Sequence, residues 1–375
     1  MNNSKTLYPP FIYSESQIVA EYADQSGKIL HISGPVGVGK TAMQRQLHLH
    51  WTGRDQDGPI SHLEWRDGVS GYATVNCVGQ STDTATGYLV PSPTGEESGD
   101  RYAVPSAWPI DSVVGDAHIT LCVDEVDKVS SEVLNCLLGL MDARDTGVLY
   151  LGTHKLGKNV KVYFTSNRRE DGSQSSKVLS APFITRTYSR SLVADVPSWV
   201  NGYAIPNGLD ASPVVAWLAS YGADWFSPPI DFRYDGRAIP CPRQWTSAAR
   251  MVDINTPHDV AVRHCLAPLV GDDAANACAA YLELIHQVKP QLEALKNGGA
   301  LPSDHREQYA LLFAAIRTIV LEHEDTGVAV KAGDLDWFLD ALAASDNEIQ
   351  QWAVPLASSA GIKLSYSPKY AKLAA

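Results

Sequence analysis

The sequence predicts an α/β fold in which a parallel-sheet core is followed by a mostly helical C-terminal region. Three observations lead to this prediction. A glycine-rich segment, GPVGVGKT at 34–41, lies between an apolar run and a helix-like stretch. Two further apolar runs, 118–123 and 160–166, end in polar residues, as parallel strands do at the edge of a sheet that binds ligands. Beyond residue 242 the apolar residues recur with the helical period.

The composition sets the broad class of the protein. At roughly 150 residues per domain, 375 residues predict two or three domains. A hydrophobic content of 45% with 19% charged residues is sufficient for a large core and differs from the composition of disordered chains. The net charge of −12 repels phosphate backbones, which disfavours broad binding to nucleic acids or anionic membranes.

The sequence shows no targeting or metal-binding pattern. The N-terminal MNNSKTLYPP has no apolar signal region, and no run of about 18 apolar residues occurs, so a soluble, cytoplasmic protein is expected. The six cysteines lack paired metal spacing and are expected to be reduced core thiols. His48 and His50 are two residues apart and do not share a helix face, while His31 lies in an apolar strand, so no metal site is expected from them.

The glycine-rich segment has the pattern G-x-x-x-x-G-K-T, formed by Gly34, Gly39, Lys40 and Thr41. Glycines let backbone N–H groups surround phosphates, and a following helix N-terminus adds positive potential. In such a cradle Lys40 reaches the β- and γ-phosphates and the Thr41 hydroxyl is a ligand for Mg²⁺. A strand before and a helix after favour this interpretation over a chance glycine turn. The predicted cradle comprises Gly34, Pro35, Val36, Gly37, Val38, Gly39, Lys40 and Thr41.

Carboxylates and an amide follow the two other predicted strands. The run 118–123 is followed by Asp124 and Glu125, and Asn167 follows the run 160–166. Asp124 is predicted to hold Mg²⁺ through water, and Glu125 to activate the attacking water as a general base. Because parallel strands end at one edge of a sheet, Asn167 is expected between Glu125 and the γ-phosphate, orienting the water. Taken alone, an asparagine after a strand is more often a turn residue.

These segments resemble, in their order, the motifs of AAA+ ATPases: GPVGVGKT, CVDEVDKV, YFTSNRRED and APFITR. APFITR after the asparagine strand and the later P-R-x-W segment, 242–245, resemble the MoxR-like branch. PLVGDDAANACAAYL at 268–282 resembles the lid helices of that family. The resemblance covers about residues 15–285 and implies a P-loop NTPase core with an α-helical lid, Mg²⁺-dependent ATP hydrolysis and a ring-shaped assembly.

The resemblance gives two arginines a role. Arg186 in APFITR corresponds to the arginine finger that reaches a neighbouring subunit's nucleotide, and Arg243 to the sensor-2 arginine that contacts the γ-phosphate from the lid of its own subunit. Both would add positive charge where the transferring phosphoryl group is negative, and the guanidinium fork suits phosphate. Arg190, four residues after Arg186, and Arg250, seven residues after Arg243 on the same helical face, remain alternatives.

Parts of the core region leave alternatives open. The second strand of the core is either 62–65 or 72–76. Residues 146–158 predict a hairpin that leads into the asparagine strand. Residues 79–116 are rich in Gly, Pro, Ser and Thr and are interpreted as an insertion. Its segment 86–90 is either a tip that touches substrate in a central pore or a solvent loop.

Prolines mark the expected passage from core to lid. Residues 225–242 contain four prolines and are predicted to form a hinge. The predicted domains are the core at 1–227 with its insertion, the lid at 228–300 and a C-terminal helical extension at 301–375, with a loose tail from 362 onward. Helices are predicted at 213–221, 243–253, 256–267, 272–296, 303–323 and 334–343.

The motifs together predict an ATPase that uses ATP and Mg²⁺ and assembles as a homo-oligomer, expected to be a hexamer. The resemblance implies that it remodels or matures a protein partner, often one with a von Willebrand factor A type domain; nucleic acid and membrane are not expected partners. One alternative is a nucleic-acid motor or helicase loader, for which Lys155, Lys158 and Lys161 would form a basic stripe. Another alternative is a nucleotide-gated switch that hydrolyses almost no ATP. The presence of Glu125, the predicted general base, argues against it.

Overall fold

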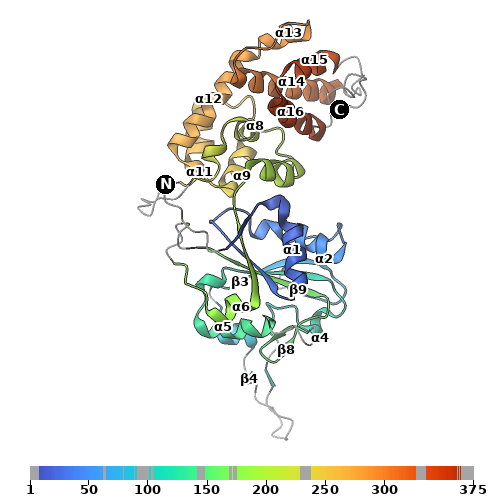
Figure 1. Ribbon diagram of the computed structural model, residues 1–375, viewed down its shortest axis with the longest axis vertical. Helices are drawn as coiled ribbons and strands as arrows, with labels where there is room; N and C mark the ends of the chain where they lie inside the picture. Colours follow the sequence, from blue (N-terminus) through green and yellow to red (C-terminus); the bar gives the residue numbers. More distant parts are fainter. Residues whose placement is uncertain are drawn as a thin grey trace. The chain divides into compact units, whose positions relative to one another are not determined.

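The structure is a computed structural model. It describes residues 8–61, 65–78, 80–87, 89–90, 101–102, 105–141, 148–168, 171, 175–228, 238–326, 335–360, 362 and 364. Its contacts divide the chain into two compact units, Met1–Val193 and Ala194–Ala375 (Figure 1). Each unit has a hydrophobic core of its own.

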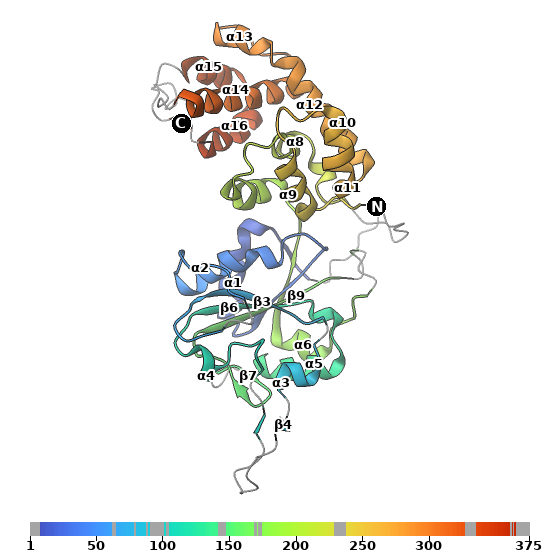
Figure 2. The same ribbon diagram turned by 180° about the vertical axis from the view of Figure 1, so that it is seen from behind.

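A six-stranded parallel sheet forms the centre of the N-terminal unit (Figures 1 and 2). The chain runs from β2 to the edge strand β3, returns through β6 and β9, and then crosses β2 to reach β10. In such sheets, ligands bind at the carboxyl ends of the strands where the order reverses, which here is beside β2. Across the sheet the strands are β1 (Pro10–Phe11), β10 (Thr187–Leu192), β2 (Ile29–Ser33), β9 (Val160–Ser166), β6 (Ile119–Asp124) and β3 (Gly71–Asn76).

Helices cover both faces of this sheet. Figures 1 and 2 show α1 and α2 on one face and α5 and α6 on the other. Ile119 to Val123 of β6 are fully buried, because a parallel strand covered on both faces meets no solvent. The helices of this unit are η1 (Tyr13–Glu15), α1 (Ser16–Gln25), η2 (Thr41–Met43), α2 (Gln44–Thr52), α3 (Thr82–Thr86), α4 (Asp111–Val114), η3 (Val126–Lys128), α5 (Ser131–Leu138), η4 (Gly139–Met141) and α6 (Ala181–Arg186).

The predicted parallel α/β core is confirmed, and one of its open alternatives is resolved. The segment 72–76 forms β3, whereas 62–64 lie outside the described residues. The hairpin expected at 146–158 is present as two short antiparallel strands, β7 (Tyr150–Leu151) and β8 (His154–Lys155). The proposed insertion contains α3, α4 and a second antiparallel pair, β4 (Leu89–Val90) with β5 (Arg101–Tyr102). Residues 88 and 91–100, which include part of the expected pore tip, lie outside the described residues.

The described part of the C-terminal unit is helical (Figures 1 and 2). Two of its segments, η6 and η9, are π-helical. Its elements are α7 (Val196–Trp199), η6 (Val200–Ala204), η7 (Ile205–Asn207), α8 (Pro213–Ser220), η8 (Ala223–Trp225), α9 (Pro242–Met251), α10 (His258–Val260), η9 (Ala261–Leu266), α11 (Ala267–Val270), α12 (Asp272–Val288), α13 (Gln291–Lys296), α14 (His305–Thr326), α15 (Asp336–Ala344) and α16 (Asn347–Ser359).

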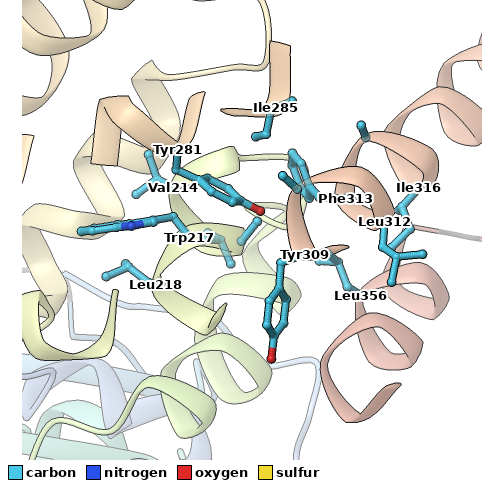
Figure 3. Packing of buried hydrophobic residues seen from close by; sticks show 14 of the residues in the cluster. Val214, Trp217, Leu218, Tyr281, Ile285, Tyr309, Leu312, Phe313, Ile316 and Leu356 are labelled. Carbon is cyan, nitrogen blue, oxygen red and sulfur yellow. The ribbon is translucent and has the colours of Figure 1, made fainter. Parts of the chain in front are cut away.

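One hydrophobic core runs through this helical unit. Figure 3 shows Trp217 of α8, Tyr281 of α12 and Phe313 of α14, which belong to this core together with other apolar side chains. The Trp217 ring also packs 5.4 Å from the ring of Trp245 on α9, measured between centroids. Helix α9 begins at Pro242, which suits the first turn because its missing N–H has no intrahelical partner there.

The predicted boundaries at 227/228 and 300/301 both fall inside this unit. Helix α8, expected in the core domain, and α14, expected in a separate extension, share the cluster that also holds the predicted lid. The predicted helix at 272–296 is divided at Pro290, because proline lacks the N–H that would continue the ladder. The expected loose tail begins with packed residues, since Ile362 and Leu364 are both buried.

A substitution in α14 should destabilise the C-terminal unit. Phe313 is fully buried, so Phe313→Ala removes a large apolar group and leaves a cavity, at a cost of about 3–5 kcal/mol. The measurement is urea unfolding followed by tryptophan fluorescence. Gln287→Ala, on the exposed side of α12, is the control and should change stability by less than about 0.5 kcal/mol. A Phe313→Ala midpoint equal to that of the control would contradict the shared core.

Candidate functional site

The glycine-rich segment forms a loop between the carboxyl end of β2 and the short helix η2. Gly39 has φ +106°, a conformation that side-chain-bearing residues rarely adopt. At Gly34 a Cβ atom would lie 2.6 Å from the Leu192 carbonyl oxygen, which is too close for any side chain. The loop therefore requires glycine at both positions, and it lies at the switch point of the sheet.

Lys40 is buried within this loop, with 7% of its surface exposed. Its Nζ donates to the carbonyl oxygens of Gly34, at 2.9 Å, and Pro35, at 2.8 Å. It also donates to Asn167 Oδ1 at 2.9 Å. The structure thus brings the predicted lysine and the predicted asparagine together, from the carboxyl ends of the neighbouring strands β2 and β9.

Asp124 is the last residue of β6, the next strand of the sheet. The Thr165 hydroxyl of β9 donates to Asp124 Oδ1, and the Glu125 backbone N–H donates to the same oxygen at 3.1 Å. These bonds fix the carboxylate at the sheet edge. The sequence predicted Asp124 at this edge, but the contribution of Thr165 depends on the pairing of β6 with β9.

Glu125 has a strained backbone. Among the described residues it is the only non-glycine residue at positive φ, with φ 60° and ψ 39°. A non-glycine residue in this region costs of order 1–3 kcal/mol, and such strain clusters at functional sites. The Glu125 Oε1 atom lies 2.6 Å from Lys128 Nζ, one turn further along η3. The left-handed backbone ends the strand at Asp124, and the ion pair with Lys128 restrains the Glu125 carboxylate.

Asp127 is a site residue that sequence reasoning missed. Its side chain is almost fully buried, and its Oδ1 accepts the Asn167 backbone N–H at 3.0 Å. Its Oδ2 atom has no hydrogen-bond partner among the described residues. The sequence contained a signal for it, because Asp127 is the third acidic residue of CVDEVDKV. It lies three residues after Asp124, so one helical turn brings it back toward the sheet edge.

His31 lies on β2 below the loop and is completely buried. Burial, together with the nearby positive charge of Lys40, lowers the pKa of His31 from 6.5 to about 3. The imidazole is therefore neutral at ordinary pH. His48, on α2, contacts Thr120 Oγ1 at 2.9 Å and Asp57 Oδ2 at 3.0 Å. Both histidines thus have structural partners, and among the described residues no group of three or more His, Cys, Asp or Glu side chains is arranged to hold a metal ion.

The residues predicted to hold Mg²⁺ fit that ion without such a cluster. Thr41 begins η2 directly after the loop, and Asp124 ends β6 at the same edge of the sheet. Mg²⁺ keeps several waters and is usually bound by one or two carboxylates together with substrate phosphates. One carboxylate and one hydroxyl beside a phosphate cradle are therefore a sufficient protein contribution.

The two candidate finger arginines differ in their contacts. Arg186 is the last residue of α6, and its Nη1 donates to the Pro182 carbonyl at 3.3 Å. Arg190, on β10, donates to the carbonyl oxygens of Pro9 at 3.1 Å and Pro10 at 2.8 Å, and lies over the Phe11 ring. The Arg190 guanidinium therefore holds the N-terminal strand against β10.

Arg243 and Arg250 both lie on α9 of the C-terminal unit, and both are exposed. The opposite face of α9 buries Trp245, Ala248 and Ala249. Both arginines therefore lie on the exposed face of α9. The sensor role of Arg243 remains a prediction.

One known protein family matches a segment of the N-terminal unit. Residues 95–187 match the AAA domain of the dynein-related subfamily. This match covers about a quarter of the chain, and it marks the segment as similar to an AAA-type domain. The matched segment carries Asp124, Glu125, Asn167 and Arg186, and the phosphate loop precedes it on the adjacent strand β2. No curated protein matches the chain.

Several solved structures are distantly similar to this chain. NtrX from Brucella abortus is 14% identical, with a TM-score of 0.35 over 92% of this chain and 67% of that one. The same protein in complex with ADP is 15% identical, with a TM-score of 0.36 over 84% of this chain and 65% of that one. A full-length MCM homolog from Methanopyrus kandleri is 9% identical, with a TM-score of 0.26 over 94% of this chain and 54% of that one. The chain therefore spans between about half and two thirds of these proteins.

Within the described ranges, none of the helices combines the length and the apolar character that crossing a bilayer demands.

The buried neutral His31 should make stability depend on pH. In the unfolded chain the pKa of His31 is 6.5, so the unfolded state binds a proton as the pH falls below that value. The folded state does not bind this proton until the pH reaches about 3. The stabilisation is therefore complete above pH 6.5 and is lost on acidification, by about 1.4 kcal/mol between pH 7.5 and 5.5. Urea unfolding of the wild type and of His31→Gln at both pH values measures it. Equal pH dependence in the two proteins would show that His31 is not buried neutral.

Proposed function

We propose that this protein hydrolyses ATP with Mg²⁺ as a ring-forming ATPase of MoxR-like type and uses the energy to remodel or mature a protein partner. Hydrolysis is supported by one observation above all: the adjacent strands β2, β9 and β6 end together with a lysine, an asparagine and an acidic pair. The 2.9 Å contact between Lys40 Nζ and Asn167 Oδ1 shows how close these ends lie.

Each residue has a defined task in this proposal. The loop from Gly34 to Thr41 binds the phosphates through backbone N–H groups, and Lys40 contributes a point charge toward the β- and γ-phosphates. Asp124 and Thr41 hold Mg²⁺, which neutralises charge on the phosphates when it is bound. Glu125 accepts a proton from the attacking water, and the Asn167 amide orients that water.

The proposed ring divides the site between subunits. Arg186 is the preferred finger because it lies in APFITR, the segment to which the resemblance gives that role, and Arg190 remains the alternative. Arg243 is proposed as the sensor that contacts the γ-phosphate from the helical unit of the same subunit. A hexamer is the proposed assembly, by resemblance to the family whose motif order the chain follows.

The proposed partner is a protein, and by the same resemblance one with a von Willebrand factor A type domain. The alternative, a nucleic-acid motor, depended on a basic stripe at the hairpin. In the structure each of its lysines lies near an aspartate: Lys155 with Asp111 at 3.4 Å, Lys158 with Asp116 at 2.7 Å, and Lys161 with Asp24 at 3.7 Å. Neutralised pairs on a chain of net charge −12 disfavour a phosphate backbone as partner. The six unpaired cysteines suit the reducing cytoplasm, where we place the protein.

Replacing the proposed base should separate binding from chemistry. Glu125→Gln preserves shape but cannot accept the proton, so ATP turnover should fall by about 10²-fold or more while nucleotide affinity is retained. Phosphate release and fluorescent-ATP titration provide the two measurements. Glu132→Gln makes the same change on the exposed first turn of α5 and should keep wild-type turnover. Turnover of Glu125→Gln at the wild-type rate would exclude Glu125 as the base.

Mixing two inactive variants should test the shared site. An Arg186→Ala subunit lacks the finger that it offers to its neighbour, whereas a Glu125→Gln subunit lacks its own base but still offers Arg186. In mixed rings some interfaces are complete, and because a finger contributes about 10³-fold or more in rate, activity should rise above either variant alone. Phosphate release against mixing ratio is the readout, with native mass spectrometry to verify mixed rings. The same mixture made with Arg190→Ala is the control; complementation by that variant instead would make Arg190 the finger.

A further inference from the structure

A chain of buried and half-buried polar side chains crosses three strands below the phosphate loop. His31, on β2, stands between Ser166 at the end of β9 and Ser189 on β10. Its Nε2 lies 2.9 Å from Ser166 Oγ, and its Nδ1 lies 3.0 Å from Ser189 Oγ. Ser189 Oγ lies 3.0 Å from Thr187 Oγ1, which continues the chain along β10.

The two ends of this chain adjoin residues of the proposed site. Ser166 directly precedes Asn167, whose side chain accepts a hydrogen bond from Lys40. Thr187 directly follows Arg186, and its hydroxyl contacts the carbonyl oxygens of Phe183 and Ile184 in the last turn of α6, at 3.1 and 3.4 Å. This series of hydrogen-bonded side chains therefore connects the end of β9 with α6, the helix that carries Arg186.

Helix α6 also contacts His31 directly. The Phe183 ring packs edge-on against the imidazole, with 5.3 Å between the ring centroids, and edge-on against Phe164 of β9. Phe183 and His31 are completely buried. A movement of either ring must therefore displace the other, because a packed interior has no free volume to absorb it.

Each serine hydroxyl in this series of side chains acts as donor or acceptor toward His31. A neutral imidazole donates from one nitrogen and accepts at the other, so the two serine hydroxyls cannot both play the same role toward His31. If Ser166 shifts, a buried ring nitrogen loses its partner, which is unfavourable unless His31 and then Ser189 follow. Only a concerted movement keeps all of these polar groups paired.

We propose that His31 is a positioning residue that couples Asn167 to the arginine-bearing helix α6, so that the nucleotide bound in one subunit alters the finger it offers to the next. This inference rests on the proposed function of Asn167 and Arg186. It assigns a purpose to a buried histidine that neither phosphate binding nor hydrolysis uses.

Hydrogen exchange of the full-length protein tests the coupling without relying on activity. Amide protection of the segment 181–192 is compared by mass spectrometry with ADP·Mg²⁺ and with a non-hydrolysable ATP analogue and Mg²⁺. In the wild type the two nucleotides should give exchange rates in α6 that differ by about threefold or more, because α6 follows the position of Asn167. Ser189→Ala removes the middle of the chain, and the difference between the two nucleotides should vanish while the affinity for each is unchanged.

Two further variants keep the test decisive. Thr187→Val breaks the same chain at its far end with little change of shape, and should abolish the difference as Ser189→Ala does. Thr120→Val is the matched control, because it removes a hydroxyl from the other buried histidine, His48, and should preserve the difference.

The outcomes separate this inference from the proposed function. If the wild type hydrolyses ATP but α6 responds equally to both nucleotides, the coupling is overturned and the ATPase remains. The coupling is likewise overturned if Ser189→Ala lowers protection by the same factor with either nucleotide, since that is the signature of a merely structural bond. If the wild type binds neither nucleotide, the proposed function falls, and the coupling with it.

Discussion

The hydrogen bond between the Lys40 ammonium group and the Asn167 side chain is the contact on which the geometry of the site depends. It joins the loop after β2 to the end of β9, and it exists because these strands are parallel neighbours. Parallel strands place their carboxyl ends at one edge, so the loop, the asparagine and the acidic end of β6 meet there although they lie far apart in the sequence. The remaining features of the site either hold this edge in place or act upon it.

Buried polar groups stabilise that edge in a consistent way. The Thr165 hydroxyl fixes Asp124, Asp127 accepts the backbone N–H of Asn167, and both bonds run between β9 and the β6–η3 segment. An unpaired polar group in the interior would be costly, so each of these bonds restricts where the strand ends can move. The strained backbone of Glu125 is tolerated within this framework.

The helical unit follows a different principle. Its stability comes from one apolar cluster to which α8, α9, α12 and α14 all contribute, rather than from polar bonds at a sheet edge. Large rings such as Trp217, Trp245 and Phe313 fill its interior. Because this cluster includes residues on both sides of positions 227 and 300, the described residues after 194 behave as one unit.

The sequence alone determined the α/β class, the loop from Gly34 to Thr41 and the strand ends at Asp124 and Asn167, because glycine spacing and apolar runs are local signals. Pro290 was an equally local signal for a helix break, yet the apolar periodicity on either side concealed it. Tertiary structure decided what depends on partners distant in the chain. The choice of 72–76 as the edge strand, the engagement of Arg190 by Pro9 and Pro10, and the contacts of Asp127 and His31 all require strands to be side by side. No pattern within one segment specifies which strand lies beside it, so these features became visible only when the sheet order was known.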